Sequence, residues 1–331
     1  MEAVIAHATT INDAHKANEG NWALEQIGDE EKKVIGNAAR YSGCCISPMA
    51  AFFGGITAQE VVKFTGKYTP CSQIFHYDQF ITLPREEVNR TTTGSRYDDQ
   101  IAIYGQEVQD KLLNLKLFMV GSGALGCEFL KAYALMGIAC GSEGSVTNTD
   151  NDNIEVSNLN RQFLFRKQHV GSSKSSVAGQ TAKDNNPAFN IKSLTEFVGP
   201  DTEHIFNDEF WEGLSFCVNA VDNVKAREYV DGRCVWYNKA LLESGTLGTQ
   251  ANTQCVIPHI TESYSDSVDP PEESIPMCTL RNFPSRIEHC IEWGRAAFNE
   301  IFVEKAGEAK DYLDDPELYI KNLKANNTTS G

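Results

Sequence analysis

The chain has 331 residues, of which 41% are hydrophobic, and a formal net charge of -16. At roughly 100–200 residues per domain, this length allows two or three units that each bury a core. The negative charge argues against general nucleic-acid binding, because such binding needs clustered Lys and Arg against phosphates. A basic protein partner suits this charge better.

Ten cysteines lie scattered along the chain, without the paired C-x-x-C spacing of zinc sites or the spacing of a disulfide framework. The first residues form no charged-then-apolar secretion signal, and no apolar run approaches the roughly 18 residues that a membrane helix requires. We therefore expect a soluble protein of the cytosol or nucleus, with no membrane contact.

The amino-terminal third predicts helices and a linker. Residues 1–40 are polar and Ala-rich with helical spacing, and the sequence assigns them no function. Ser47-Pro48 predicts a helix start and Gly66 a helix end. Inside this helix, the pair Gly54-Gly55 predicts close packing against another element, because glycine costs up to about 1 kcal/mol relative to alanine there. The small, polar residues 90–96 predict a linker.

From Tyr97 onward, helices and strands alternate. The patterns predict strands at 115–120, 145–149 and 216–220, and helices at 104–114, 127–135, 172–184 and 224–238. This alternation predicts an α/β protein with a doubly wound parallel sheet. Ligands of such sheets bind beyond the carboxyl ends of the strands, and Gly121, Asp150 and Asp222 each directly follow an expected strand. Three strand ends therefore point to one crevice.

The first strand end carries a glycine-rich turn, Gly121-Ser-Gly-Ala-Leu-Gly126, which opens a helix. Backbone N–H groups at a helix start face anions, so the turn predicts a phosphate site. The alternative is a tight turn whose glycines serve only close helix packing.

The second strand end carries Asp150-Asn-Asp152, followed by Arg161 and Lys174. A nicotinamide-binding domain needs one acidic residue here, for the ribose, and we assign Asp150 to that contact. A second carboxylate can hold Mg²⁺, and an Arg and a Lys can neutralise a triphosphate. On residue type alone, Asp152 and Asp222 could equally be helix caps or turn formers, and the two cations could form a solvated face.

Three segments resemble the ubiquitin-activating enzyme family. Residues 150–165 with 219–227 resemble its adenylating domain, residues 275–293 its catalytic-cysteine segment in the ubiquitin-specific form, and residues 52–84 the end of its inactive adenylation half. The resemblance covers most of the chain from about Arg40 onward. It implies a doubly wound, Rossmann-like adenylation fold of the ThiF/MoeB type with flanking helical fragments.

The same resemblance implies a division of the chain and a set of ligands. The divisions are a helical segment at 1–40, the C-terminal part of the inactive half at 41–95, the active adenylation domain at 96–277 and the truncated start of the catalytic-cysteine domain at 278–331. The implied cofactors are ATP and Mg²⁺, with Asp152 and Asp222 as metal ligands. The implied nucleotide-binding residues are Gly121, Gly123, Ala124, Gly126, Asp150, Asp152, Asn158, Arg161, Gln162, Lys174, Asp222 and Asn223. Gln162 could instead only support its loop.

Cys278 is the expected nucleophile, with Thr279 and Arg281 beside it. A cysteine is more often a small buried apolar residue, but a helix start and a guanidinium would favour the thiolate, and the resemblance selects Cys278 among the ten. The implied reaction adenylates the C-terminal carboxylate of ubiquitin, forms a thioester on Cys278 and transfers the acyl group to a ubiquitin-conjugating enzyme. The remainder of the parent enzyme, including the inactive adenylation half, is an implied partner, and we expect this chain to be an incomplete piece with little activity of its own.

Two other interpretations remain. One is an adenylating enzyme for another ubiquitin-like or sulfur-carrier protein; the other is a nicotinamide-dependent oxidoreductase, or a non-catalytic scaffold, on the same fold. Simple sulfur-carrier enzymes lack the extension at 261–293 and carry paired cysteines for zinc that this sequence lacks. Binding of Mg-ATP but not of a nicotinamide cofactor would exclude the oxidoreductase.

Overall fold

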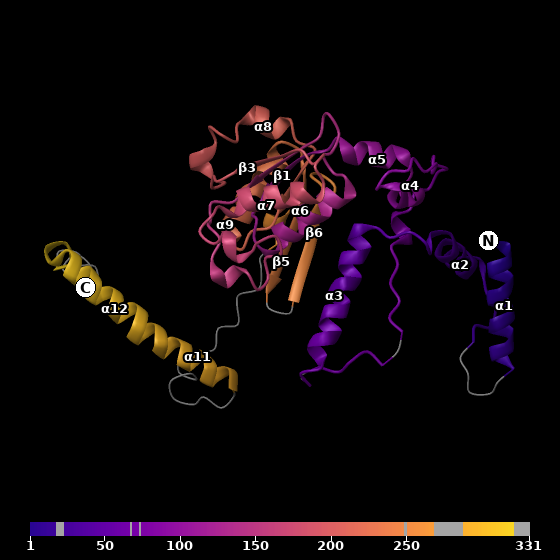
Figure 1. The fold of residues 1–331 in the computed structure, drawn as a ribbon, viewed down its shortest axis with the longest axis horizontal. Coiled ribbons are helices and arrows are strands. Elements are labelled where there is room, and N and C mark those ends of the chain that lie inside the picture. Colours follow the sequence, from indigo (N-terminus) through magenta and orange to yellow (C-terminus); the bar gives the residue numbers. More distant parts are fainter. Residues whose placement is uncertain (18–22, 67, 73, 248–249, 268–286, 321–331) are drawn as a thin grey trace. The chain divides into compact units, whose positions relative to one another are not determined.

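The computed structural model describes residues 1–17, 23–66, 68–72, 74–247, 250–267 and 287–320 (Figure 1). The chain divides into two compact units, Met1–Ser267 and Val268–Gly331. The finer boundaries at residues 40, 95 and 277 stay predictions. Across the described ranges, no helix has both the length and the apolar character needed to cross a membrane.

The first unit begins with α1 (Glu2–Lys16), α2 (Asp29–Tyr41) and α3 (Ser47–Lys63). Pro48 lies in the first turn of α3, where its missing N–H has no helical partner to lose. Gly66 follows the end of α3 with a φ of 80°. The helix predicted between Ser47 and Gly66 is therefore confirmed.

The glycine pair of α3 contradicts our expectation of close packing. A Cβ atom added at Gly54 or at Gly55 would meet no atom of the described residues within 4 Å. Val61 and Phe64, farther along the chain, are 61% and 92% exposed. Glycine spacing alone cannot show which element, if any, covers a helix face.

The sheet has six strands in the order β3-β2-β1-β4-β5-β6. Its strands are β1 (Lys116–Val120), β2 (Ser145–Thr149), β3 (Ile191–Leu194), β4 (Phe216–Asn219), β5 (Ala240–Leu247) and β6 (Gln250–Val256). The first five are parallel, and β6 pairs antiparallel with β5. Val120 pairs with Thr149 on one side and Asn219 on the other, so three carboxyl ends lie at one level. The predicted doubly wound α/β sheet is confirmed.

Helices cover both faces of this sheet. They are α6 (Ala124–Met136) and α7 (Lys174–Asn185) on one face, and α8 (Asp208–Glu212) and α9 (Val224–Trp236) on the other; α4 (Asp98–Tyr104) and α5 (Gln106–Leu113) precede β1. Side chains of β1 alternate between two buried clusters, because successive residues of a strand point to opposite faces. Leu117 and Met119 pack with residues of α6 and α7, and Phe118 and Val120 pack with residues of α8 and α9.

Short 3-10 turns connect these elements. They are η1 (Phe80–Thr82), η2 (Val156–Asn158), η3 (Lys167–His169), η4 (Pro200–Thr202) and η5 (Tyr264–Asp266). Helix α5 corresponds to the helix predicted at 104–114, whereas α4 has no counterpart among the predicted helices. Gly105, with a φ of 89°, separates the two helices.

In the second unit, the described residues form α11 (Ile287–Phe298), the π-helical turn η6 (Asn299–Glu304) and α12 (Lys305–Asp314). The expected nucleophile Cys278 and its neighbours Thr279 and Arg281 lie outside the described residues.

Replacing Gly54 or Gly55 with alanine is expected to stabilise this chain by about 0.5–1 kcal/mol each, because alanine is the better helix former and has open space at both positions. Chemical denaturation of the single variants measures this change. A loss of stability in either variant would show that this face of α3 is covered in solution.

Candidate functional site

A cavity of about 500 Å³ lies at the carboxyl ends of the parallel strands. Residues that follow β1, β2, β3 and β4 contribute to its wall, together with Thr246 near the end of β5. Most of the expected nucleotide ligands line it: Gly121, Gly123, Ala124, Asp150, Asp152, Arg161, Gln162, Lys174, Asp222 and Asn223. The structure therefore brings together residues that stand up to 102 positions apart in the sequence, from Gly121 to Asn223.

The turn after β1 needs glycine for close approach. Gly121 has a φ of 97°, and a Cβ atom there would lie 2.4 Å from the carbonyl oxygen of Ala220, at the end of β4. A Cβ atom on Gly126 would lie 2.3 Å from the carbonyl oxygen of Gly121. Gly126 thus allows α6 to pack onto the turn and is not itself part of the cavity wall.

Helix α6 begins at this turn without a side-chain cap. The first N–H groups of a helix lack partners within the helix and carry partial positive charge. The uncapped N–H groups at the start of α6 are therefore suited to a phosphate at this turn, as the sequence predicts.

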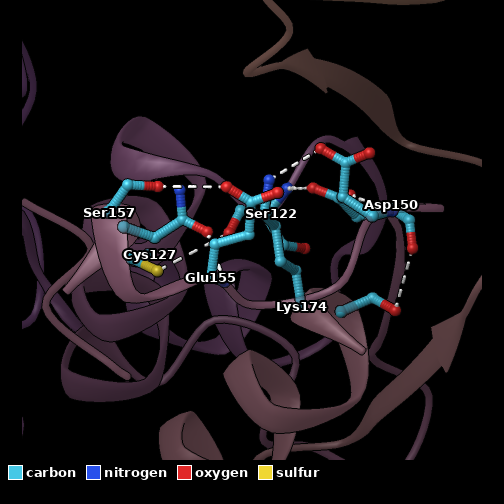
Figure 2. A network of polar contacts seen from close by, with 9 residues as sticks. Ser122, Cys127, Asp150, Glu155, Ser157 and Lys174 are labelled. Carbon is cyan, nitrogen blue, oxygen red and sulfur yellow. Dashed lines mark hydrogen bonds and ion pairs between the residues drawn. The ribbon is translucent and has the colours of Figure 1, made fainter. Parts of the chain in front are cut away.

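Asp150 ties the end of β2 to the glycine-rich turn. Its Oδ2 accepts a hydrogen bond from the backbone N–H of Ser122 at 2.7 Å, and its Oδ1 accepts one from Asp152 N at 2.9 Å (Figure 2). Burial raises the pKa of the Asp150 carboxyl, and the bond from Ser122 opposes that rise. Asp150 therefore shapes the cavity, and its contact with a ribose stays a prediction.

Lys174, the first residue of α7, forms an ion pair with Asp152 at 2.7 Å between Nζ and Oδ2. The lysine side chain is 12% exposed and the aspartate side chain 63% exposed. The ammonium group is therefore held at the wall of the cavity, with its charge balanced by a carboxylate that faces solvent. Arg161, the other expected cation, is exposed and donates from Nη1 to the carbonyl oxygen of Ser157.

Asn158 and Gln162 have different surroundings. Asn158 is buried, lies outside the cavity wall and accepts a hydrogen bond at Oδ1 from Glu155 N, at 2.9 Å. Its carbonyl oxygen accepts hydrogen bonds from the backbone N–H groups of Arg161 and Gln162, so Asn158 supports the loop that carries these two residues, and its contact with a nucleotide stays a prediction. Gln162 is also buried but lines the cavity, and its Oε1 has no hydrogen-bond partner among the described residues.

Asp222 and Asn223 follow β4. Asn223 caps α9, because its Oδ1 accepts a hydrogen bond from Ala226 N at 2.8 Å. Asp222 lines the cavity, and its carboxylate makes no hydrogen bond or ion pair with any residue in the described ranges. It is therefore available to a ligand.

Asp152 and Asp222 fit a metal that arrives together with phosphates. No group of three or more His, Cys, Asp and Glu side chains within the described part of the chain could hold a metal ion by itself. Mg²⁺ typically uses one or two carboxylates and completes its coordination with substrate phosphates and water. Two carboxylates on one cavity are enough for that mode of binding.

Several residues of the cavity wall were missed by sequence reasoning. Glu196 and Phe197 follow β3, a four-residue strand with no predicted counterpart. Arg227 also lines the cavity and lies in the segment 219–227 that carries the family resemblance. It stands four residues after Asn223, and residues at this spacing lie on the same side of a helix, so the sequence could have placed Arg227 beside Asn223.

Comparisons with known proteins place the chain in a family. Residues 97–312 match the model of the ThiF family. A ubiquitin-activating enzyme E1 1 of Arabidopsis thaliana is 48% identical over 97% of this chain and 30% of its own length. The enzyme of that name from Candida albicans is 52% identical over 86% of this chain and 29% of its own length.

Among solved structures, the crystal structure of E. coli MccB with ATP is 26% identical, with a TM-score of 0.45 over 52% of each chain. The chain spans about 30% of the length of the curated relatives. Since the family model matches more than half of its residues, the chain belongs to the ThiF family.

Proposed function

We propose that this chain is part of a ubiquitin-activating enzyme, and that its cavity binds Mg-ATP and adenylates the C-terminal carboxylate of ubiquitin. The observation that carries the proposal is the meeting of two carboxylates, Asp152 and Asp222, with Lys174 at a glycine-rich helix start. Hydride transfer to a nicotinamide cofactor needs neither the second carboxylate nor the cation. The names of the two relatives support the choice of ubiquitin as substrate.

In this proposal the ubiquitin carboxylate attacks the α-phosphorus of ATP and pyrophosphate leaves. Lys174 and Arg161 offset the negative charge that grows on the phosphate oxygens, and the N–H groups at the start of α6 orient them. Asp152 and Asp222 would hold Mg²⁺, which when bound supplies neutralisation of the phosphate charge.

The later steps lie with residues outside the described ranges. The thiolate of Cys278 would attack the acyl adenylate and release AMP, giving a thioester that passes to a cysteine of a ubiquitin-conjugating enzyme. Thr279 and Arg281 would support the thiolate. The remainder of the parent enzyme, including an inactive adenylation half, would complete the site, and we expect the enzyme in the cytoplasm and nucleus, without nucleic-acid or membrane partners.

Adenylation of another ubiquitin-like protein is the second candidate, because the same cavity would serve any C-terminal carboxylate. Cavity chemistry does not distinguish these substrates; the ubiquitin-specific form of the segment 275–293 favours ubiquitin.

ATP–pyrophosphate exchange in the full-length parent enzyme tests the proposed function. With ubiquitin present, the unchanged enzyme should catalyse exchange, and Asp222→Asn should reduce it at least tenfold because the metal loses a ligand. Cys278→Ala should retain exchange but lose the ubiquitin adduct that reducing agents cleave, since adenylation precedes thiol attack. Exchange with another ubiquitin-like protein alone would contradict the choice of ubiquitin, and a persistent adduct would contradict the choice of Cys278.

The ion pair between Asp152 and Lys174 generates a second prediction. In the ligand-free cavity, phosphate must compete with Asp152 for the ammonium group, which lies 2.7 Å from the carboxylate. If Asp152 holds Mg²⁺ in the complex, the metal releases Lys174 to the phosphates. Asp152→Asn should therefore strengthen binding of metal-free ATP several-fold and weaken binding of Mg-ATP.

Calorimetry with ATP plus EDTA and with ATP plus Mg²⁺ measures both effects. Asp201→Asn, at an exposed position of η4, is the matched control and should change neither affinity. Weaker binding of both forms by Asp152→Asn would mean that Asp152 does not compete for Lys174.

A further inference from the structure

A buried polar cluster lies beside the cavity and joins α9 to β4 and β5. The Nη1 of Arg227 lies 3.4 Å from Oε1 of Glu243, and Nδ2 of Asn219 donates to Oε2 of Glu243 at 2.7 Å. Glu243 is 4% exposed and Asn219 is fully buried. The hydrogen bond from β4 orients the carboxylate on β5. The guanidinium lies against this carboxylate as an ion pair, because Oε1 of Glu243 has no hydrogen-bond partner among the described residues.

The other side of the guanidinium holds the loop after β4. Nη2 of Arg227 donates to the carbonyl oxygen of Val221 at 2.9 Å. Val221 directly precedes Asp222 and Asn223, and all three line the cavity together with Arg227. This hydrogen bond links the backbone next to the proposed metal ligand Asp222 to the ion pair with Glu243 on β5, in addition to the cap that Asn223 makes on α9.

Gly245 leaves the room that this side chain occupies. A Cβ atom at position 245 in β5 would lie 2.7 Å from Nη2 and 2.8 Å from Nη1 of Arg227. The ring of Tyr264 also lies near the guanidinium, with 5.9 Å between its centroid and Cζ. A buried ion pair adds little net stability compared with apolar residues of similar volume, so stability alone does not account for this arrangement.

We propose that Arg227 is a positioning residue of the nucleotide site: held by Glu243 and given room by Gly245, it fixes the loop from Val221 to Asn223 so that Asp222 faces the metal of bound Mg-ATP. This inference rests on the proposed nucleotide binding. Arg227 is suited to the task because its planar guanidinium faces the Glu243 carboxylate and donates to the Val221 carbonyl oxygen at the same time, whereas a lysine ammonium on a flexible stem is a point charge.

Two substitutions test the positioning role by different routes. Arg227→Lys keeps the charge but removes the fork, and Gly245→Ala keeps every charge but places a methyl group where the guanidinium lies. By calorimetry on the 331-residue chain, each should weaken Mg-ATP binding about tenfold and change binding of ATP in EDTA less than about twofold. The double variant should be little worse than either single variant, because both act through one group.

Controls separate positioning from folding. Gly232→Ala, on α9, places a Cβ atom where no atom of the described part of the chain lies within 4 Å, and it should change neither affinity. Thermal unfolding checks that each variant is folded. If Gly245→Ala does not fold, Glu243→Gln replaces it, since the glutamine can still accept the hydrogen bond from Asn219 but loses the ion pair, and the same metal-dependent loss is expected.

The positioning role would be overturned if the variants lost equal affinity for ATP with and without Mg²⁺. It would also be overturned if Mg-ATP affinity were unchanged in Arg227→Lys and in Gly245→Ala, or in Glu243→Gln where that variant replaces Gly245→Ala. Neither result would contradict nucleotide binding itself. Failure of the unchanged chain to bind Mg-ATP would overturn the proposed function, and the positioning role with it.

Discussion

The end of β1 approaches the end of β4 so closely that only glycine fits between them. A side chain at position 121 would collide with the carbonyl oxygen of Ala220, and the φ of 97° at this position also favours glycine. Because of this approach, the glycine-rich turn and the loop that carries Asp222 face one cavity. Asp150, directly after β2, also holds this turn, because its carboxylate accepts a hydrogen bond from the backbone N–H of Ser122.

If the cavity binds ATP as proposed, the charges around it favour ATP that is bound together with a metal cation. Carboxylates of Asp150, Asp152, Glu196 and Asp222 line it, against the cations of Arg161, Lys174 and Arg227. Lys174 is already paired with Asp152, and Arg227 with the buried Glu243. A triphosphate without a metal ion would therefore be repelled by the unpaired carboxylates. A bound Mg²⁺ would be coordinated by two of these carboxylates and would remove that repulsion.

How much the sequence predicts depends on how local each signal is. Strands β1, β2 and β4 and the cavity-lining residues that follow them were predictable, because apolar runs and polar strand ends are adjacent in the chain. Strand β3 has only four residues, and β6 takes its antiparallel place by pairing with β5, which no local pattern reveals. Arg227 became interpretable only when the fold placed Glu243, from an unpredicted strand, beside it. For the pair Gly54-Gly55 the sequence-based expectation was wrong. Paired glycines in a helix are typical of close packing, but no atom of the described residues lies within 4 Å of a Cβ atom at either position.

Peptide-resolved hydrogen–deuterium exchange of this chain, with and without Mg-ATP, tests most directly the claim that the converging strand ends form the nucleotide site. The account predicts slower exchange in peptides that cover residues 121–126, 150–152 and 222–227, and unchanged exchange in α1, α2 and α11. No change in the three peptides at saturating Mg-ATP, or slower exchange confined to other elements, would contradict it.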